Sequence, residues 1–208
     1  MAAARVLGLI LAGGLGRRMG GGDKTLLRLG GRTLLSRVVE RLGPQCGAGL
    51  VLCANGDPGR FPEFSGAVVA DTVPGRAGPL AGLLAGLEHA AAHHGDVTDG
   101  VSVSGDAPFL PGDLVARLDA ARIAAGRTIA LAASGGREHY TVALWPVSLR
   151  HDLRAALTER DERRVGAFIA RHGAAVVEWP IEPVDPFLNL NTPGDLAAAE
   201  GALARLGA

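Results

Sequence analysis

A continuous apolar run, residues 5–12 (RVLGLILA), passes directly into a glycine-rich segment at residues 13–23. Uninterrupted apolar runs of this length are typical of strands in a parallel sheet, because helices cover both faces of such a sheet. Glycines after the strand let the backbone turn sharply and approach a ligand closely, because no Cβ is present. The start of the chain therefore predicts a buried strand followed by a binding loop.

Strand and helix patterns alternate along the rest of the chain. Helices are predicted at 33–42, 79–93, from the Pro111-Gly112-Asp113 cap to about 125, near 147–157 and 162–172, and at 193–206; further strands are predicted at 49–54, 67–70, 99–104, 128–133, 140–144 and 174–178. This alternation predicts an α/β fold with a doubly wound, mostly parallel, Rossmann-like sheet and helices on both faces. The sequence contains no repeat, linker or low-complexity tail, so we expect a single domain over residues 1–208.

Composition excludes several classes of protein. The formal net charge is zero and the pI is near 7, whereas generic nucleic-acid binders have a basic excess. No apolar stretch reaches the roughly 18 residues that a membrane helix needs. The two cysteines, Cys46 and Cys53, are too few for a zinc knuckle or a disulfide framework, which predicts reduced thiols in a cytoplasmic protein.

Two charged segments follow predicted strands, where open α/β sheets bind their ligands. We expect the backbone N–H groups of the glycine-rich segment to converge on a phosphate chain, and Arg18 and Lys24 to neutralise its charge. The segment matches neither of the common phosphate-loop or dinucleotide fingerprints, and a flexible turn is the alternative interpretation. Asp106 follows the strand at 99–104, which suits Mg²⁺ bound to nucleotide phosphates; a turn aspartate is the alternative.

Two further polar segments lie at the same predicted edge. Asp71 follows a strand and precedes the glycines Gly78 and Gly82, which either bring the backbone close to a ligand or pack a helix terminus. Asn189 and Asn191 alternate along an extended stretch, so both face one side. Their amides suit a pterin edge or a phosphate, and turn and cap chemistry is the alternative.

Taken in order, these segments resemble the molybdenum cofactor guanylyltransferase (MobA) family of nucleotidyltransferases. The resemblance covers nearly the whole chain and rests on LAGGLGRRMGGGDK, VLCAN, ADT, GPLAG, GDAPFLP, HYTVAL, DERRVGAF and FLNLNTPGDL. It implies the fold of the nucleotide-diphospho-sugar transferases. It also implies a reaction in which the terminal phosphate of molybdopterin attacks the α-phosphate of GTP and pyrophosphate leaves. Such chemistry depends on positioning and charge neutralisation rather than on a nucleophilic side chain.

The resemblance also implies site residues and partners. It assigns catalysis to Arg18, Lys24 and Asp106, with Asp106 as the Mg²⁺ ligand; GTP binding to Leu11, Ala12, Gly13, Gly14, Lys24, Asn55, Asp71 and Asp106; and molybdopterin binding to Asn189, Asn191 and Arg164. The resemblance further implies that the N-terminal half binds the nucleotide and the C-terminal half the molybdopterin. It implies GTP and molybdopterin as the substrates. Transient contacts with proteins that supply molybdopterin, and with apo-molybdoenzymes that receive the product, are further implied partners.

The sequence departs from the family pattern at two positions. His139-Tyr140 stands where the family has His-Pro, and Ala107 stands where it often has Thr after the metal-binding aspartate. Three alternatives remain at this point: a cytidylyltransferase relative, a sugar-phosphate or methylerythritol-phosphate nucleotidyltransferase, and a non-catalytic nucleotide sensor. The glycines after Ala12 favour guanine over cytosine, and a sensor has less need of Lys24, Asp71 and Asp106 together.

Overall fold

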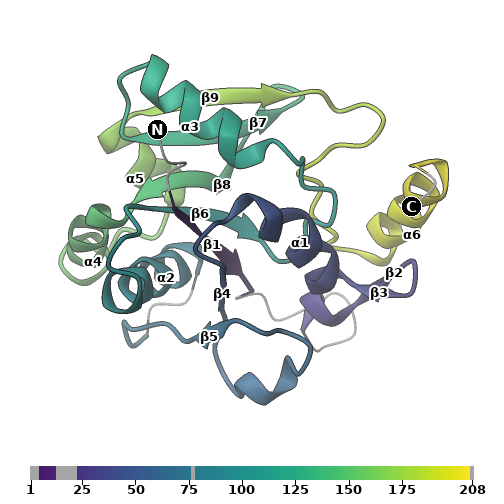
Figure 1. Ribbon diagram of the computed structural model, residues 1–208, viewed down its shortest axis with the longest axis horizontal. Coiled ribbons are helices and arrows are strands. Elements are labelled where there is room, and N and C mark those ends of the chain that lie inside the picture. The colour runs from purple at the N-terminus through teal and green to yellow at the C-terminus, as the bar shows by residue number, and fades with distance from the viewer. Residues whose placement is uncertain (1–4, 13–22, 76–77, 207–208) are drawn as a thin grey trace.

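A seven-stranded sheet forms the centre of the protein in the computed structural model, which describes residues 5–12, 23–75 and 78–206 (Figure 1). Side by side, the strands are β5 (Ala67–Val69), β4 (Leu50–Cys53), β1 (Val6–Leu11), β6 (Asp99–Ser104), β8 (Arg137–Pro146), β7 (Ile129–Ser134) and β9 (Ala174–Trp179). Only β8 runs antiparallel to its neighbours within this sheet. The predicted mostly parallel sheet is confirmed, with one reversed strand that the sequence pattern did not indicate.

The predicted buried strand is β1, which lies between β4 and β6. Leu9 is paired with Val51 on one side and with Ser102 on the other. Alternate β1 residues enter two different hydrophobic clusters, Leu7 and Leu9 in one and Val6 and Ile10 in the other. An uninterrupted apolar run is therefore required, because both faces of this strand are covered.

Helices cover both faces of the sheet, as the sequence predicts. The first face carries α1 (Leu34–Leu42) and α3 (Leu114–Ala124), and the second carries α2 (Pro79–His93), α4 (Arg150–Thr158) and α5 (Val165–His172). None of the helices within the described residues has both the length and the apolar sequence needed to cross a bilayer.

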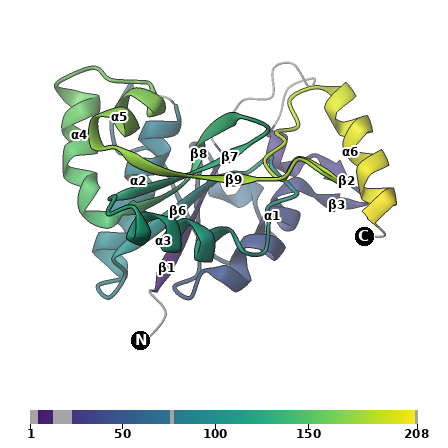
Figure 2. The same cartoon turned by 90° about the horizontal axis from the view of Figure 1, so that it is seen from above.

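The last helix, α6 (Pro193–Leu206), packs away from the sheet. It contacts a small hairpin, β2 (Arg28–Leu29) and β3 (Arg32–Thr33), through a third cluster that includes Leu29, Leu34 and Leu203. Figure 2 shows this unit at the opposite end of the molecule from α4 and α5. The sequence pattern predicts α6 but not the hairpin, whose turn glycines Gly30 and Gly31 have φ of 55° and 76°.

Two helix starts differ from expectation for identifiable reasons. Asp113 stands at the N-cap of α3, but its Oδ1 accepts a hydrogen bond from the Trp179 indole at 3.0 Å instead of capping the helix. The helix predicted from 162 begins at Val165. There, Glu162 Oε1 accepts from the backbone N–H of Arg163 and of Arg164, each at 2.9 Å, before the helical ladder starts.

Candidate active site

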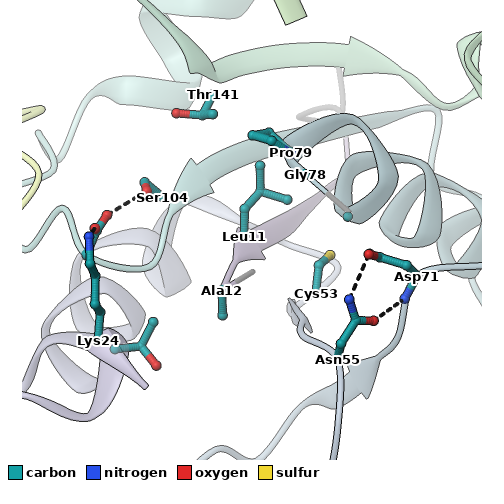
Figure 3. Close-up of a pocket in the computed structure, with 13 residues that line it drawn as sticks. Leu11, Ala12, Lys24, Cys53, Asn55, Asp71, Gly78, Pro79, Ser104 and Thr141 are labelled. Atoms are coloured by element: carbon teal, nitrogen blue, oxygen red, sulfur yellow. Dashed lines mark hydrogen bonds and ion pairs between the residues drawn. The ribbon is translucent and has the colours of Figure 1, made fainter. Parts of the chain in front are cut away.

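A cavity of about 320 Å³ lies at the carboxyl ends of the central strands (Figure 3). The ends of β1, β4 and β6, the segment after β5 and the N-terminus of α2 all contribute to its wall. Gly13, Gly14 and Arg18 lie outside the described residues. Of the residues for which the family resemblance implies GTP binding, six line the cavity: Leu11, Ala12, Lys24, Asn55, Asp71 and Asp106.

One end of the cavity carries opposite charges. Lys24 Nζ lies 3.7 Å from Asp106 Oδ2, and the two side chains are only 18% and 14% exposed. The hydroxyl of Ser104 donates to Asp106 Oδ1 at 2.6 Å, so one carboxylate oxygen is fixed while the other faces the lysine. An ammonium group and a carboxylate are thus held together where an anionic ligand or a cation can compete for either one.

A glycine allows these two charges to approach each other. Gly105 separates Ser104 from Asp106, and its N–H donates to the carbonyl of Leu11 at 3.0 Å. A Cβ on Gly105 would lie 2.7 Å from Cγ2 of Thr25, the residue that follows Lys24. A larger residue at 105 would therefore push the turn that carries Lys24 away from the end of β6.

The other end of the cavity is polar and internally hydrogen-bonded (Figure 3). Asn55 Nδ2 donates to Asp71 Oδ2 at 2.7 Å, and the backbone N–H of Asp71 donates to Asn55 Oδ1 at 2.8 Å. These residues follow β4 and β5, which are neighbours in the sheet. The reciprocal pair fixes both side chains next to a cavity that also has Gly78 and Pro79 in its wall.

A C-terminal loop reaches the charged end. Lys24 Nζ donates to Asn191 Oδ1, although the two residues are 167 positions apart in the chain. The backbone N–H of Leu190 donates to the carbonyl of Asp106 at 3.1 Å. Asn189 Oδ1 is buried and has no hydrogen-bond partner among the described residues. The structure therefore brings Asn191 to Lys24 and leaves an acceptor of Asn189 unused within the described part of the chain.

Arg164 does not line the cavity. It stands at the N-terminus of α5, and its side chain is 85% exposed. Its Nε lies 4.0 Å from Oε1 of Glu162.

Sequence reasoning missed part of the cavity wall. Ser104 and Thr141 line it, and so does the buried Thr25. Ser104 carried a usable signal, since it is a polar residue at the end of a buried strand and directly precedes Gly-Asp. Thr141 did not, because it reaches this edge only through the reversed direction of β8.

A buried polar network anchors the loop that precedes the two asparagines. His139 Nε2 lies 2.7 Å from Ser134 Oγ, which donates to Asp185 Oδ1 at 2.8 Å. Because a hydroxyl has one proton, Nε2 must donate to the serine. Burial lowers the pKa of His139. The His-Tyr departure from the family pattern therefore lies within a continuous strand, β8, with His139 buried and Tyr140 exposed.

Neither cysteine has the properties of a nucleophile. Both are free and buried, and burial raises the pKa of the Cys46 and Cys53 thiols to about 12. Cys53 lines the cavity, yet as a protonated thiol near neutral pH it adds apolar surface rather than reactivity. The site chemistry is thus left to Lys24, Asp106 and the polar side chains around them.

Comparison with known proteins gives the family. Residues 8–176 match the MobA-like NTP transferase domain. The chain belongs to this family. A molybdenum cofactor guanylyltransferase from Bradyrhizobium sp. (strain ORS 278) is 57% identical over 195 residues, which cover 94% of this chain and 92% of the relative. The resemblance to the MobA family that the motifs indicated is therefore confirmed.

Solved structures share the fold. Molybdopterin-guanine dinucleotide biosynthesis protein A from Archaeoglobus fulgidus superposes with a TM-score of 0.74 at 24% identity, covering 96% of this chain and 100% of that one. Rv0371C from Mycobacterium tuberculosis H37Rv, solved in complex with manganese, has a TM-score of 0.68 at 17% identity, with 95% and 99% covered. The predicted nucleotidyltransferase fold is confirmed, and one of these structures was solved with manganese bound.

Proposed function

We propose that the protein transfers the GMP moiety of GTP to the terminal phosphate of molybdopterin. The phosphate oxygen forms a bond to the α-phosphorus of GTP, the bond to the β-phosphate oxygen breaks, and pyrophosphate leaves. The product is the molybdopterin guanine dinucleotide. The observation that carries this proposal is the meeting of Lys24, Asp106 and Asn191 at one end of a cavity whose other end presents Asn55 and Asp71.

The two ends of the cavity suit different parts of the nucleotide. We assign the phosphates to Lys24, at the charged end, and the base and ribose to Asn55 and Asp71, at the polar end. Leu11 and Ala12 provide the wall between them at the end of β1. Gly13, Gly14 and Arg18 stay predictions for the phosphate side, on the residue pattern alone.

A magnesium ion suits the donor set at the charged end. Mg²⁺ prefers oxygen ligands and is usually held by one or two carboxylates together with substrate phosphates and water. Among the described residues no group of three or more His, Cys, Asp or Glu side chains could hold a metal by itself. Asp106 is thus proposed to hold Mg²⁺ jointly with the GTP phosphates, where the ion would neutralise charge that develops on the leaving pyrophosphate.

The other side chains at the charged end contribute through their charge and their fixed positions. Lys24 supplies a positive charge for the phosphate oxygens, and Ser104 keeps Asp106 oriented through its 2.6 Å hydrogen bond. Groups fixed before the reaction stabilise developing charge without a further reorganisation cost. No covalent enzyme intermediate is required, because the acceptor phosphate attacks directly.

Molybdopterin is proposed to bind beside the C-terminal loop. Asn189 offers the unused buried acceptor noted above, and Asn191 adjoins Lys24. Arg164 is a more distant candidate for the molybdopterin phosphate. We propose a single domain over residues 1–208 in which the N-terminal half binds the nucleotide and the C-terminal half binds the molybdopterin. Proteins that supply molybdopterin or accept the product are proposed as transient partners.

A transfer assay tests this function. The purified protein, Mg²⁺ and molybdenum-loaded molybdopterin are incubated with GTP or with CTP in parallel, and the dinucleotide product is separated and identified. Product from GTP alone is expected. Product from CTP would overturn the guanine assignment, and GTP binding without product would overturn molybdopterin as the acceptor.

A further inference from the structure

Besides Lys24 and Asp106, a third charged side chain, that of Asp23, contacts the turn that carries Lys24. Asp23 caps the 3₁₀ turn Lys24–Leu26: its Oδ1 accepts from the N–H of Thr25 at 3.1 Å and from the Thr25 hydroxyl at 2.7 Å. The other oxygen, Oδ2, accepts from Nε of Arg60 at 3.1 Å. The Asp23 side chain is 10% exposed and that of Arg60 is 30% exposed, so the pair is shielded from most of the solvent.

Arg60 is itself held in place from several sides. Its Nη1 donates to the carbonyl of Asp57 at 3.1 Å, and its guanidinium lies 4.5 Å above the ring of the buried Phe61. Gly56, with φ of 89°, leaves room for it, because a Cβ there would lie 2.8 Å from Nη1. These three contacts restrain the Arg60 side chain, whereas a freely moving surface arginine would not be restrained in this way.

These contacts join the two loops that supply opposite ends of the cavity. Arg60 follows Asn55 in the segment after β4, whereas Asp23 and Lys24 belong to the segment after β1. Arg60 does not line the cavity itself. Among the described residues, Arg60 is linked to the cavity wall through Asp23 and the turn that Asp23 caps.

We propose that Arg60 is a positioning residue for Lys24, acting through Asp23. Its guanidinium neutralises the Asp23 carboxylate and fixes the oxygen that does not cap the turn. Without Arg60, a partly buried negative charge would remain unpaired next to the lysine that meets the phosphates. An unpaired carboxylate there repels a triphosphate and competes for the Lys24 ammonium group. The inference deepens the proposed function and rests on its assignment of the GTP phosphates to Lys24.

The sequence allows the surroundings of Lys24 to be measured by a single NMR resonance. Lys24 is the only lysine in the chain, whereas arginine supplies every other long basic side chain. Protein labelled with ¹³C at lysine Cε therefore gives a single side-chain resonance, which belongs to Lys24. That signal reports on the position and electrostatic surroundings of one ammonium group, independently of turnover.

The experiment compares Arg60→Ala, Asp23→Asn, the double variant and a control. Asp23→Asn keeps an oxygen that can cap the turn but removes the charge. Arg32→Ala is the control, because Arg32 is an arginine of the neighbouring hairpin in a 2.8 Å surface pair with Glu40. For each protein, the dissociation constant of GTP with Mg²⁺ is measured by calorimetry, together with the Lys24 resonance and the melting temperature.

A charge acting through Asp23 gives a distinctive result. Arg60→Ala should weaken GTP binding about tenfold, a free-energy change expected for one partly buried charged hydrogen bond, and should shift the Lys24 resonance. Adding Asp23→Asn should restore GTP affinity to within about threefold of the wild type, because the unpaired charge is gone. Arg32→Ala should leave both readouts unchanged.

Two results would overturn the proposal. One is an Arg60→Ala protein that binds GTP as the Arg32→Ala control does. The other is a double variant that binds no better than Arg60→Ala, because Arg60 would then touch the nucleotide directly or serve only stability. If Arg60→Ala does not fold, Arg60→Gln, which keeps most of the length without the charge, enters the same comparison.

Failure of the proposed function gives a different pattern. A wild-type protein that binds GTP but forms no dinucleotide from molybdopterin overturns the proposed acceptor and leaves the Arg60 comparison decisive. A wild-type protein that binds no GTP overturns both.

Discussion

The two ends of the cavity are built on different principles. At the charged end, Lys24, Asp106 and Asn191 come from three distant segments, and the ion pair of 3.7 Å is wide enough to be exchanged for ligand contacts. At the polar end, Asn55 and Asp71 are 16 residues apart, follow adjacent strands and satisfy each other. The charged end is therefore suited to meet charge that changes during a reaction, and the polar end to hold a ligand part that does not react.

The largest effect is expected from Asp106→Ala. Loss of the carboxylate that is proposed to hold Mg²⁺ should lower kcat roughly a thousandfold, because several kcal/mol of charge stabilisation are lost. Folding should change little, since the backbone hydrogen bond from Leu190 to the Asp106 carbonyl remains. Steady-state kinetics with Mg²⁺, together with thermal unfolding, measure both quantities.

Asp71→Ala is the matched control, because it removes the same group from the polar end. It should raise KM for GTP with a much smaller change in kcat. Equal kcat losses in the two variants would contradict the difference between the ends.

The second effect concerns Asn191→Asp, which places a carboxylate next to Lys24. In a partly exposed site such a charge changes the interaction with phosphates by about 2 kcal/mol, or roughly thirtyfold in affinity. Both GTP and molybdopterin should bind more weakly, because Lys24 contacts residue 191 in the free protein. Separate titrations with each ligand measure the two losses, with Asn191→Ser as the neutral control. A loss confined to molybdopterin would show that the two halves of the site act independently.

A smaller effect is expected from Asn55→Ala. It leaves the Asp71 N–H without its 2.8 Å partner and frees the Asp71 carboxylate. Because Asn55 is exposed, water replaces part of what is lost, and KM for GTP should rise about tenfold with kcat nearly unchanged. Kinetics with GTP and with GDP as a competing ligand measure this change. A fall in kcat as large as that of Asp106→Ala would place Asn55 at the reacting phosphates.

Much of this arrangement was predictable from local sequence. The run at 5–12 required a strand covered on both faces, and the segments after β4, β5 and β6 carry the polar residues Asn55, Asp71 and Asp106 that meet in the cavity. What sequence could not provide was contact between distant segments. The pairing of Lys24 with Asn191 and the reversed direction of β8 depend on tertiary packing that no short-range pattern encodes.

Local signals also failed where a side chain had a stronger tertiary partner. Asp113 has the residue type and position of a helix cap, but its carboxylate accepts a hydrogen bond from the Trp179 indole instead. The hairpin β2–β3 is too short for a strand pattern, and it is stabilised by packing of Leu29 against α6. In both cases the deciding contact lies far away in the sequence.

The smallest effect is expected from Arg164→Ala, which tests how far the molybdopterin site extends. With its side chain 85% exposed and outside the cavity lining, Arg164 acts on a bound phosphate mainly through solvent, where ions screen charges over roughly 8–10 Å. KM for molybdopterin should rise no more than about threefold, less so in high salt, while KM for GTP stays constant. Arg163→Ala is the matched control, since Arg163 is also exposed and pairs with Asp161 at 3.2 Å. A tenfold rise for Arg164→Ala alone would mean that this arginine contacts the substrate directly, and that the molybdopterin side of the site is charged like the Lys24 end rather than polar like the Asn55 end.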